Sequence, residues 1–156
     1  MTKPPAEKLL IGWREWISLP DLGVAAIKSK VDTGARSSTL HAFDLTHERV
    51  STDATVIRFF IHPFQDDDAN VVEASAPLVE YREVRSSNGD REVRPVIASR
   101  IRLFGRSRRV ELTLTNRDEM GFRILLGRSA VRRRFIVDPS RSFIGGGDSV
   151  APPRPD

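Results

Sequence analysis

The chain is organised around the stretch Val31-Asp32-Thr33-Gly34-Ala35-Arg36-Ser37-Ser38-Thr39-Leu40, a short polar turn between two apolar runs. The runs at 24–31 and 39–43 are each typical of a β-strand, so Asp32 lies where a strand ends. Gly34 permits a sharp reversal and the close approach of another chain. A carboxylate in this place is either catalytic or an ordinary turn former, because Asp and Gly are both common in turns.

The composition bounds the class of protein. A length of 156 residues predicts one domain, and 39% hydrophobic residues are enough for a core. The apolar runs are too short to span a membrane, and the first residues do not follow a signal-peptide pattern. We therefore expect a cytoplasmic protein without a membrane partner. The sequence has no cysteine, which excludes disulfides, thiol catalysis and thiolate zinc sites.

Arginine dominates the basic side chains. Lys and Arg number 25 against 21 Asp and Glu. The planar guanidinium suits carboxylate and phosphate ligands, so this bias indicates either an anionic ligand or a solvated Arg-rich surface. The basic cluster of Arg128 and residues 132–134 has no interleaved aromatic residues, and no nucleic-acid partner is expected.

Short alternating runs bounded by turn residues predict a mainly β fold, a small closed barrel. The expected strands cover residues 10–19, 24–31, 39–43, 55–61, 71–84, 92–98, 100–104, 109–115, 122–126 and 135–139. One short helix is expected at 129–134, with Ser129 near its start. We expect a flexible lead-in at 1–9, the barrel domain at 10–144 and a disordered tail at 145–156.

Two positions refine the predicted strands. Asn88-Gly89 supplies the positive backbone angles of a tight hairpin turn between the strands on either side. Pro95 cannot donate to a sheet ladder, so it predicts an edge strand or a bulge.

Metal, nucleotide and serine chemistry have weaker support. Residues 47–51, His-Glu-Arg-Val-Ser, lack the second histidine of a helical zinc signature, although His41, His47, His62 and residues 66–68 leave a metal-dependent hydrolase as an alternative. The segment from Gly121 to Arg128 does not have the spacing or the lysine of a phosphate-binding loop. Ser37 and Ser38 lie near His41 in sequence, a weak serine hydrolase option. No cofactor and no metal site are expected.

Asp32-Thr33-Gly34-Ala35 followed by Thr39-Leu40 resembles the active-site turn of retropepsin-like aspartic peptidases. Residues 124–129, Ile-Leu-Leu-Gly-Arg-Ser, resemble the segment that packs beside that turn and leads into a short helix. With residues 11–15, 30–36, 85–89 and 114–122, the chain resembles a bacterial family often labelled "ATP-dependent zinc protease", over about residues 10 to 144. Some members of that family are associated with enzymes that add glutamates to a ribosomal protein.

The resemblance implies an aspartic endopeptidase in which Asp32 is one of two carboxylates that activate a water molecule. It implies that Thr33 braces the turn through its hydroxyl and that Gly34 lets the substrate backbone lie close. The hairpin at Asn88-Gly89 is either a flap over the site or a plain surface hairpin. Only one Asp-Thr-Gly occurs, so the second carboxylate is expected from a homodimer, with Asp118 as the alternative within the chain.

Two departures from the family pattern affect the expected specificity. Viral relatives have an acidic residue where this chain has Arg36, and that residue pairs with the arginine corresponding to Arg128. Here the two arginines either diverge or share an anion. If they share one, the cleft is expected to favour substrates with Glu or Asp side chains. By resemblance, substrate contact falls to Ala35, Arg36, Asn88, Gly89 and Arg128. Neither an ATP loop nor a closed zinc motif accompanies the family label.

The sequence thus predicts an aspartic peptidase that cleaves acidic peptide segments. The alternatives are a catalytically silent peptide-binding barrel and a metal-dependent hydrolase.

Overall fold

The computed structural model describes residues 7–65, 67–85, 88–116 and 121–145. Asp118 and the expected tail beyond residue 145 lie outside the described residues. The strands are β1 (Leu9–Gly12), β2 (Arg14–Leu19), β3 (Val24–Val31), β4 (Ser38–His41), β5 (Phe43–Ser51), β6 (Ala54–Ile61), β7 (Val72–Arg85), β8 (Arg91–Leu103), β9 (Arg106–Thr115), β10 (Ile124–Leu126) and β11 (Phe135–Asp138). One 3₁₀ turn, η1 (Pro20–Leu22), and one short helix, α1 (Arg128–Val131), accompany them in these residues. The predicted mainly β fold with a short helix is confirmed.

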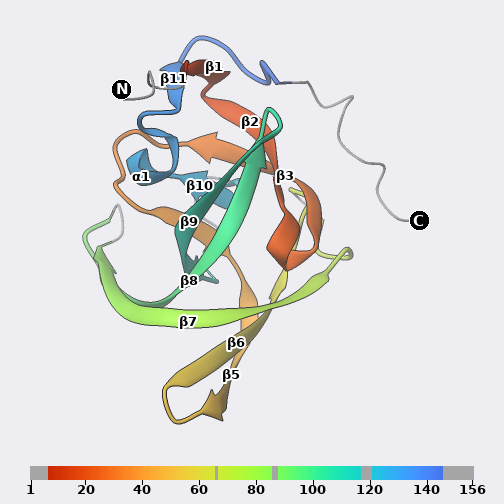
Figure 1. The fold of residues 1–156 in the computed structure, drawn as a ribbon, viewed down its shortest axis with the longest axis vertical. Coiled ribbons are helices and arrows are strands. Elements are labelled where there is room, and N and C mark those ends of the chain that lie inside the picture. Colours follow the sequence, from red (N-terminus) through yellow and green to blue (C-terminus); the bar gives the residue numbers. More distant parts are fainter. Residues whose placement is uncertain (1–6, 66, 86–87, 117–120, 146–156) are drawn as a thin grey trace, which may run out of the picture.

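Nine of the strands form one sheet in the order β2-β3-β10-β4-β9-β8-β7-β6-β5 (Figure 1). Strand β2 also pairs with β8 at Ser18 and Arg102, so the sheet curls back on itself. Strands β1 and β11 make a separate parallel pair. The β5-β6 hairpin projects away from the rest of the molecule, at the bottom of Figure 1. This topology places β10 between β3 and β4, the two strands that flank the polar turn.

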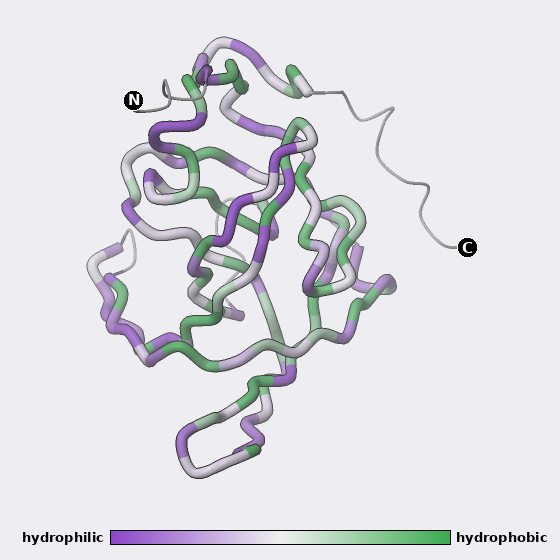
Figure 2. Tube along the Cα trace, in the orientation of Figure 1, coloured by the Kyte–Doolittle hydropathy of each residue, from purple (hydrophilic) through white to green (hydrophobic). Residues whose placement is uncertain are grey.

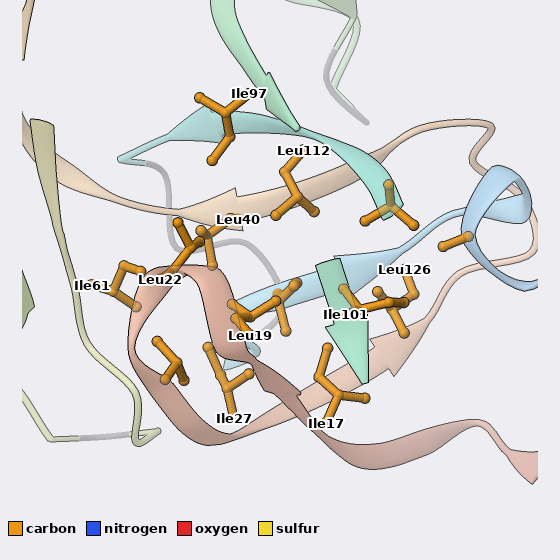
Figure 3. Close-up of a cluster of buried hydrophobic side chains, with 14 of the residues drawn as sticks. Ile17, Leu19, Leu22, Ile27, Leu40, Ile61, Ile97, Ile101, Leu112 and Leu126 are labelled. Atoms are coloured by element: carbon orange, nitrogen blue, oxygen red, sulfur yellow. The ribbon is translucent and has the colours of Figure 1, made fainter. Parts of the chain in front are cut away.

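The alternating sequence pattern gives the sheet one buried face. Hydrophilic and hydrophobic residues alternate along most strands, as the purple and green segments of Figure 2 show. One face therefore turns inward and forms a core of aliphatic side chains (Figure 3). Its fully buried members include Leu40 on β4, Leu112 on β9 and Leu126 on β10. Burial of this apolar surface fixes the strand register around the turn, since a shift of one residue would expose it.

Residues 10–19 form two strands rather than the single expected one. Strand β2 pairs with β3 as the predicted hairpin, whereas β1 pairs with β11. Glu15 explains the division. Its buried carboxylate accepts hydrogen bonds from the backbone N–H groups of Gly12 at 2.7 Å, Ile144 at 2.9 Å and Gly145 at 3.0 Å. The carboxylate thus fastens the segment after β11 to the start of β2.

The expected strands at 92–98 and 100–104 are one long strand, β8, and Pro95 does not lie at an edge. Strand β8 runs between β7 and β9, with Pro95 opposite Tyr81. The irregularity that a proline requires lies on the partner strand, where the β7 register shifts between Leu78 and Glu80. The predicted hairpin turns are present, with Gly89 at φ 90° between β7 and β8 and Gly105 at φ 73° between β8 and β9.

Candidate active site

The polar turn from Asp32 to Ser37 is held mainly by the segment that begins at the end of β10. The N–H of Asp32 donates to the Leu126 carbonyl at 2.8 Å. In the opposite direction, the N–H of Arg128 donates to Ala35 at 2.8 Å and that of Ser129 to Arg36 at 3.1 Å. The segment at 124–129 therefore lies beside the turn, as the resemblance implied. Backbone hydrogen bonds in both directions fix the turn rigidly.

Gly127 sets how closely the two segments approach. Its backbone N–H donates to the Ser38 hydroxyl at 3.0 Å. A Cβ atom at this position would collide with the carbonyl oxygen of Ser37 and with the carbonyl carbon of Arg36. Only glycine therefore fits between the turn and helix α1 without a shift of the backbone.

The Asp32 carboxylate lies at the start of this turn and is partly exposed. Its Oδ1 accepts the N–H of Gly34 at 3.0 Å, while the N–H of Ala35 donates to the Asp32 carbonyl at 3.2 Å. A Cβ atom on Gly34 would lie 3.2 Å from Oδ1, so glycine keeps the carboxylate uncrowded. Among the described residues no other hydrogen bond or ion pair reaches this carboxylate. Its second oxygen is available to water, a substrate or a partner carboxyl group.

Thr33 is exposed and contributes a backbone group to the site. Its carbonyl accepts a hydrogen bond from Arg128 Nη1 at 3.0 Å. Within the residues that the structure describes, its hydroxyl makes no hydrogen bond. The bracing of the turn therefore comes from Arg128 and from the backbone, and the implied role of the Thr33 hydroxyl stays a prediction.

A pocket of about 650 Å³ adjoins the turn. Its polar lining includes Arg36, Arg128 and Arg132 beside Thr33 and Ser129, and its apolar wall is made of Val131, Phe135 and Val137. No carboxylate is among the described lining residues. Arg36 and Arg128 therefore line one space.

The cationic surroundings of this pocket extend beyond it. Burial lowers the pKa of the Arg108 guanidinium, and the neighbouring charges of Arg134, Arg132 and Arg133 lower it further. Arg108 Nη1 donates to the carbonyls of Ala130 at 3.2 Å and Arg132 at 2.8 Å, so it also caps the end of α1. Closely spaced like charges of this kind favour an anionic ligand.

A second pocket, of about 310 Å³, joins the turn to the β7-β8 hairpin. Arg36, Ser37 and Ser129 line one side, and Arg82 and Glu111 line the other. Arg82 donates to Glu80 at 2.8 Å and to Glu111 at 3.0 Å. These hydrogen bonds, chiefly the one to Glu111, raise the pKa of Arg82. Because Arg36 and Ser129 line both pockets, the two form one groove along the turn.

Asn88 and Gly89 are exposed at the tip of the β7-β8 hairpin. Arg82 lies further back in the β7-β8 ladder, opposite Arg94. Asn88 Oδ1 accepts the N–H of Asp90 at 3.2 Å, which stabilises the reversal. The hairpin is thus present as expected, and its use as a flap stays a prediction. The second carboxylate candidate, Asp118, lies outside the described residues.

His41, His47 and Ser38 contact other groups. His41 Nε2 contacts the Asn116 carbonyl at 3.1 Å, and Ser38 receives the Gly127 N–H, so the two do not form a nucleophile and base. His47 stacks on Tyr81, with ring centroids 5.8 Å apart. In the described part of the chain no group of three or more metal-ligating side chains gathers. No helix in this part is long and apolar enough to cross a membrane.

Sequence reasoning assigned no place in the groove to Arg82, Glu111 or Ser129, although it put Ser129 at the start of the helix beside the turn. Each is an ordinary residue in its own strand or helix, and only the pairing of β7, β8 and β9 brings the first two to the turn. The one available signal for Arg82 and Glu111 was their opposite charge on alternating strands. The strand register that makes them neighbours is not visible in the sequence.

Comparison with known proteins links nearly the whole chain to one family. Residues 10–147 match the family profile described as RimB-like, retropepsin-like aspartic endopeptidase RimB. Among curated proteins, a probable alpha-L-glutamate ligase of Shewanella pealeana is 46% identical over 139 residues, which cover 89% of this chain and 30% of the relative. A protein of the same name from Parasynechococcus marenigrum is 46% identical over 135 residues, 86% of this chain and 29% of the relative. The chain spans about three-tenths of the length of these relatives.

A solved structure shares the fold. The crystal structure of a Legionella pneumophila protein of unknown function superposes with a TM-score of 0.70 at 27% sequence identity, covering 88% of this chain and 98% of that one.

Proposed function

The chain belongs to the RimB-like family of retropepsin-like aspartic endopeptidases, and from this premise we propose that it hydrolyses peptide bonds with Asp32 as a catalytic carboxylate. The observation that carries the proposal is the Asp32 side chain itself. One of its oxygens accepts the N–H of Gly34, and the other has no hydrogen-bond partner among the described residues, on a turn that is held by the segment at 126–129. A reacting group needs this combination of fixed position and access.

The chemistry requires a second carboxyl group. Two carboxylates a few ångströms apart share one proton, because both cannot ionise cheaply. The ionised one takes a proton from water as the water oxygen attacks the peptide carbonyl carbon. The protonated one then gives its proton to the nitrogen as the C–N bond breaks.

We propose that the second carboxyl group is Asp32 of another copy of the chain. The support is the open Oδ2 of Asp32 and the absence of another carboxylate in contact with it among the described residues. An isologous dimer brings identical residues together at its two-fold axis. Asp118 is the alternative partner within one chain.

The groove along the turn supports a preference for acidic peptides. Arg36 and Arg128 face one pocket that has no described carboxylate in its lining, and Arg132 adds a third guanidinium. Relatives that contain a similar segment are named for alpha-L-glutamate ligation, and glutamate is acidic. A substrate carboxylate between these side chains would gain charge-assisted hydrogen bonds, worth about 1.5–3 kcal/mol each.

The Asp32→Asn variant tests the catalytic proposal. It keeps the shape of the turn but removes the ionisable group, so cleavage of an acidic peptide library should fall at least a thousandfold. Asp53→Asn is the matched control, since Asp53 is exposed in the turn between β5 and β6. Equal cleavage by the Asp32→Asn variant and the wild type would refute an aspartic mechanism. Inhibition by a chelator in that case would favour the metal-dependent alternative.

The Arg36→Glu variant tests the acidic preference separately. Reversing this charge should lower kcat/KM for Glu-rich peptides by about 10- to 100-fold and leave neutral peptides nearly unchanged. Arg102→Glu, on the exposed side of β8, makes the same change in net charge away from the groove. Equal ratios of acidic to neutral cleavage in wild type and Arg36→Glu would exclude Arg36 as the source of the preference.

A further inference from the structure

One face of the sheet extends from Asp32 across three neighbouring strands. Side chains alternate along β3, so Lys30 points to the face opposite the buried Val31. Asp32 directly follows this strand, and its backbone N–H continues the pairing with β10 by donating to the Leu126 carbonyl at 2.8 Å. Lys30 pairs with Leu125 on β10, Leu125 with Thr39 on β4, and Thr39 with Thr113 on β9. Paired residues share a face, so these side chains form the floor beside the catalytic carboxylate.

The floor is accessible next to Asp32. Leu125 and Thr39 are half-buried, whereas their neighbours on the core face, Leu126 and Leu40, are fully buried. Thr39 lies two strands from Asp32, on the order of 10 Å at the usual strand spacing. An extended peptide advances about 3.3 Å per residue. A substrate whose scissile bond lies at Asp32 therefore places one of its residues, a few positions from that bond, over Thr39.

A buried charge makes this floor polar. The Arg94 side chain on β8 is only 4% exposed, and its Nη1 donates to Thr39 Oγ1 at 3.5 Å. Its Nε and Nη2 each lie 3.1 Å from Glu92 Oε2, and Thr115 Oγ1 donates to the same carboxylate at 3.3 Å. Well-packed apolar residues often replace a buried ion pair without loss of stability. The opposite face of these strands is aliphatic, so stability alone does not account for a guanidinium here.

The hydrogen bonds orient the Thr39 hydroxyl. A guanidinium can only donate, so the Thr39 oxygen accepts from Arg94 and its hydrogen is left for another acceptor. Thr113 Oγ1 lies 3.0 Å away, and its own hydrogen can go to the Ser38 carbonyl at 3.4 Å. The Thr39 hydroxyl is thus prepared to donate to Thr113 or to an oxygen of a substrate above it.

We propose that Thr39 is a specificity-determining residue, oriented by Arg94, that selects a substrate side chain ending in an oxygen. This inference rests on the proposed function and deepens it. The selected side chains are carboxylates and carboxamides such as Glu and Gln, and aliphatic ones of similar size such as Leu and Met are disfavoured. A subsite built to hydrogen-bond its ligand rejects analogues that lack the partner group, because its polar groups are then left unsatisfied. Arg94 acts as a positioning residue.

The experiment uses a randomised decapeptide library in two ways. Wild type is incubated with the library, and the residues around each cleaved bond are identified by mass spectrometry. Immobilised Asp32→Asn protein is used to retain peptides without cleaving them, and the retained sequences are aligned. The Thr39→Val substitution is made in both backgrounds, because valine keeps the shape of threonine and removes the hydroxyl. Thr46→Val, on the exposed part of β5, is the control.

Wild type should prefer Glu and Gln over Leu and Met by roughly tenfold at one position near the cleaved bond. Thr39→Val should abolish or reverse that preference and leave the profile of the other positions unchanged. Arg94→Met should reduce the same preference while its thermal unfolding still shows a single folded state. An unchanged profile in the Thr39→Val protein would refute the inference, even if cleavage is normal. Absence of cleavage with a shifted retention profile would instead refute the proposed function and support the subsite.

Discussion

At the scale of single residues, Gly127 controls the position of the turn that carries Asp32. We predict that Gly127→Ala destabilises the protein by about 1–3 kcal/mol and lowers kcat more than it raises KM. The added methyl group meets backbone atoms of Ser37 and Arg36, which cannot rotate away. The turn must therefore move, and Asp32 moves with it. Urea unfolding and steady-state kinetics on an acidic peptide measure the two effects.

Gly105→Ala is the matched control. Gly105 lies in the turn between β8 and β9 at φ 73°, and nothing lies within 4 Å of an added Cβ atom. Alanine there is strained by its backbone angle, at a cost of about 1–2 kcal/mol, but it is remote from the turn. Both variants should lose stability, and only Gly127→Ala should lose kcat. Equal kcat in the two variants would show that the fit of Gly127 against the turn does not affect the catalytic step.

At the scale of elements, Asp21 on η1 fastens that turn to strand β8. Its carboxylate accepts hydrogen bonds from the Arg100 backbone N–H at 3.0 Å and from Arg100 Nη2 at 2.6 Å. The side-chain hydrogen bond from Arg100, followed by the backbone one, lowers the pKa of Asp21 below its ordinary value of 3.8. A carboxyl group whose pKa is lower in the folded state than in the unfolded state stabilises the protein at pH values above its unfolded-state pKa. This contribution is lost as the pH falls through the folded-state pKa.

We predict that Asp21→Asn shifts the urea midpoint downward at pH 7 and that the shift shrinks as the pH falls below 4. The direction follows from the lowered pKa, because protonation removes the charge that the variant lacks at every pH. Asp53→Asn, an exposed substitution in the turn between β5 and β6, is measured beside it as a control for the loss of one surface carboxylate. A midpoint difference that stays constant from pH 7 to pH 3 would contradict the assigned role of the Arg100 contact.

The elements also mark the limit of sequence-based prediction. Alternation identified the β8-β9 hairpin, because both strands and their turn are contiguous in the chain. It did not separate β1 from β2, since that boundary depends on the contact of Glu15 with backbone groups about 130 positions away. Pro95 left an edge and a bulge open, because the sequence of one strand does not reveal that an irregularity lies on its partner strand.

At the scale of the whole molecule, catalysis is expected to depend on association. If two copies of Asp32 form the catalytic pair, the specific activity falls on dilution in step with the dimer fraction measured by sedimentation. Added inactive Asp32→Asn protein should then suppress wild-type activity by forming mixed dimers. Constant specific activity at concentrations where the protein is monomeric would contradict this. Loss of activity in Asp118→Asn would then identify the partner carboxylate.

The candidate site was predictable to the extent that its parts carry local signals. Asp32, Gly34 and the Gly127-Arg128 pair stand in short motifs, so the turn and its neighbouring segment were identified before the fold. The Arg82-Glu111 ion pair and the Arg94-Thr39 contact join residues 29 and 55 positions apart in the chain. Such contacts are set by sheet register, which results from the packing of the entire core.

The turn that carries Asp32 is supported by a late part of the chain, which affects when this turn can form during synthesis. Arg128, which donates to Thr33, is translated 95 positions after it, and the Glu15 contacts need residues 144 and 145. A nascent chain that stops before β10 lacks the strand that belongs between β3 and β4. The turn that carries Asp32 therefore cannot gain these contacts until residues 128–145 have left the ribosome. Under the proposed function, premature termination in this region would yield inactive fragments rather than unregulated proteases.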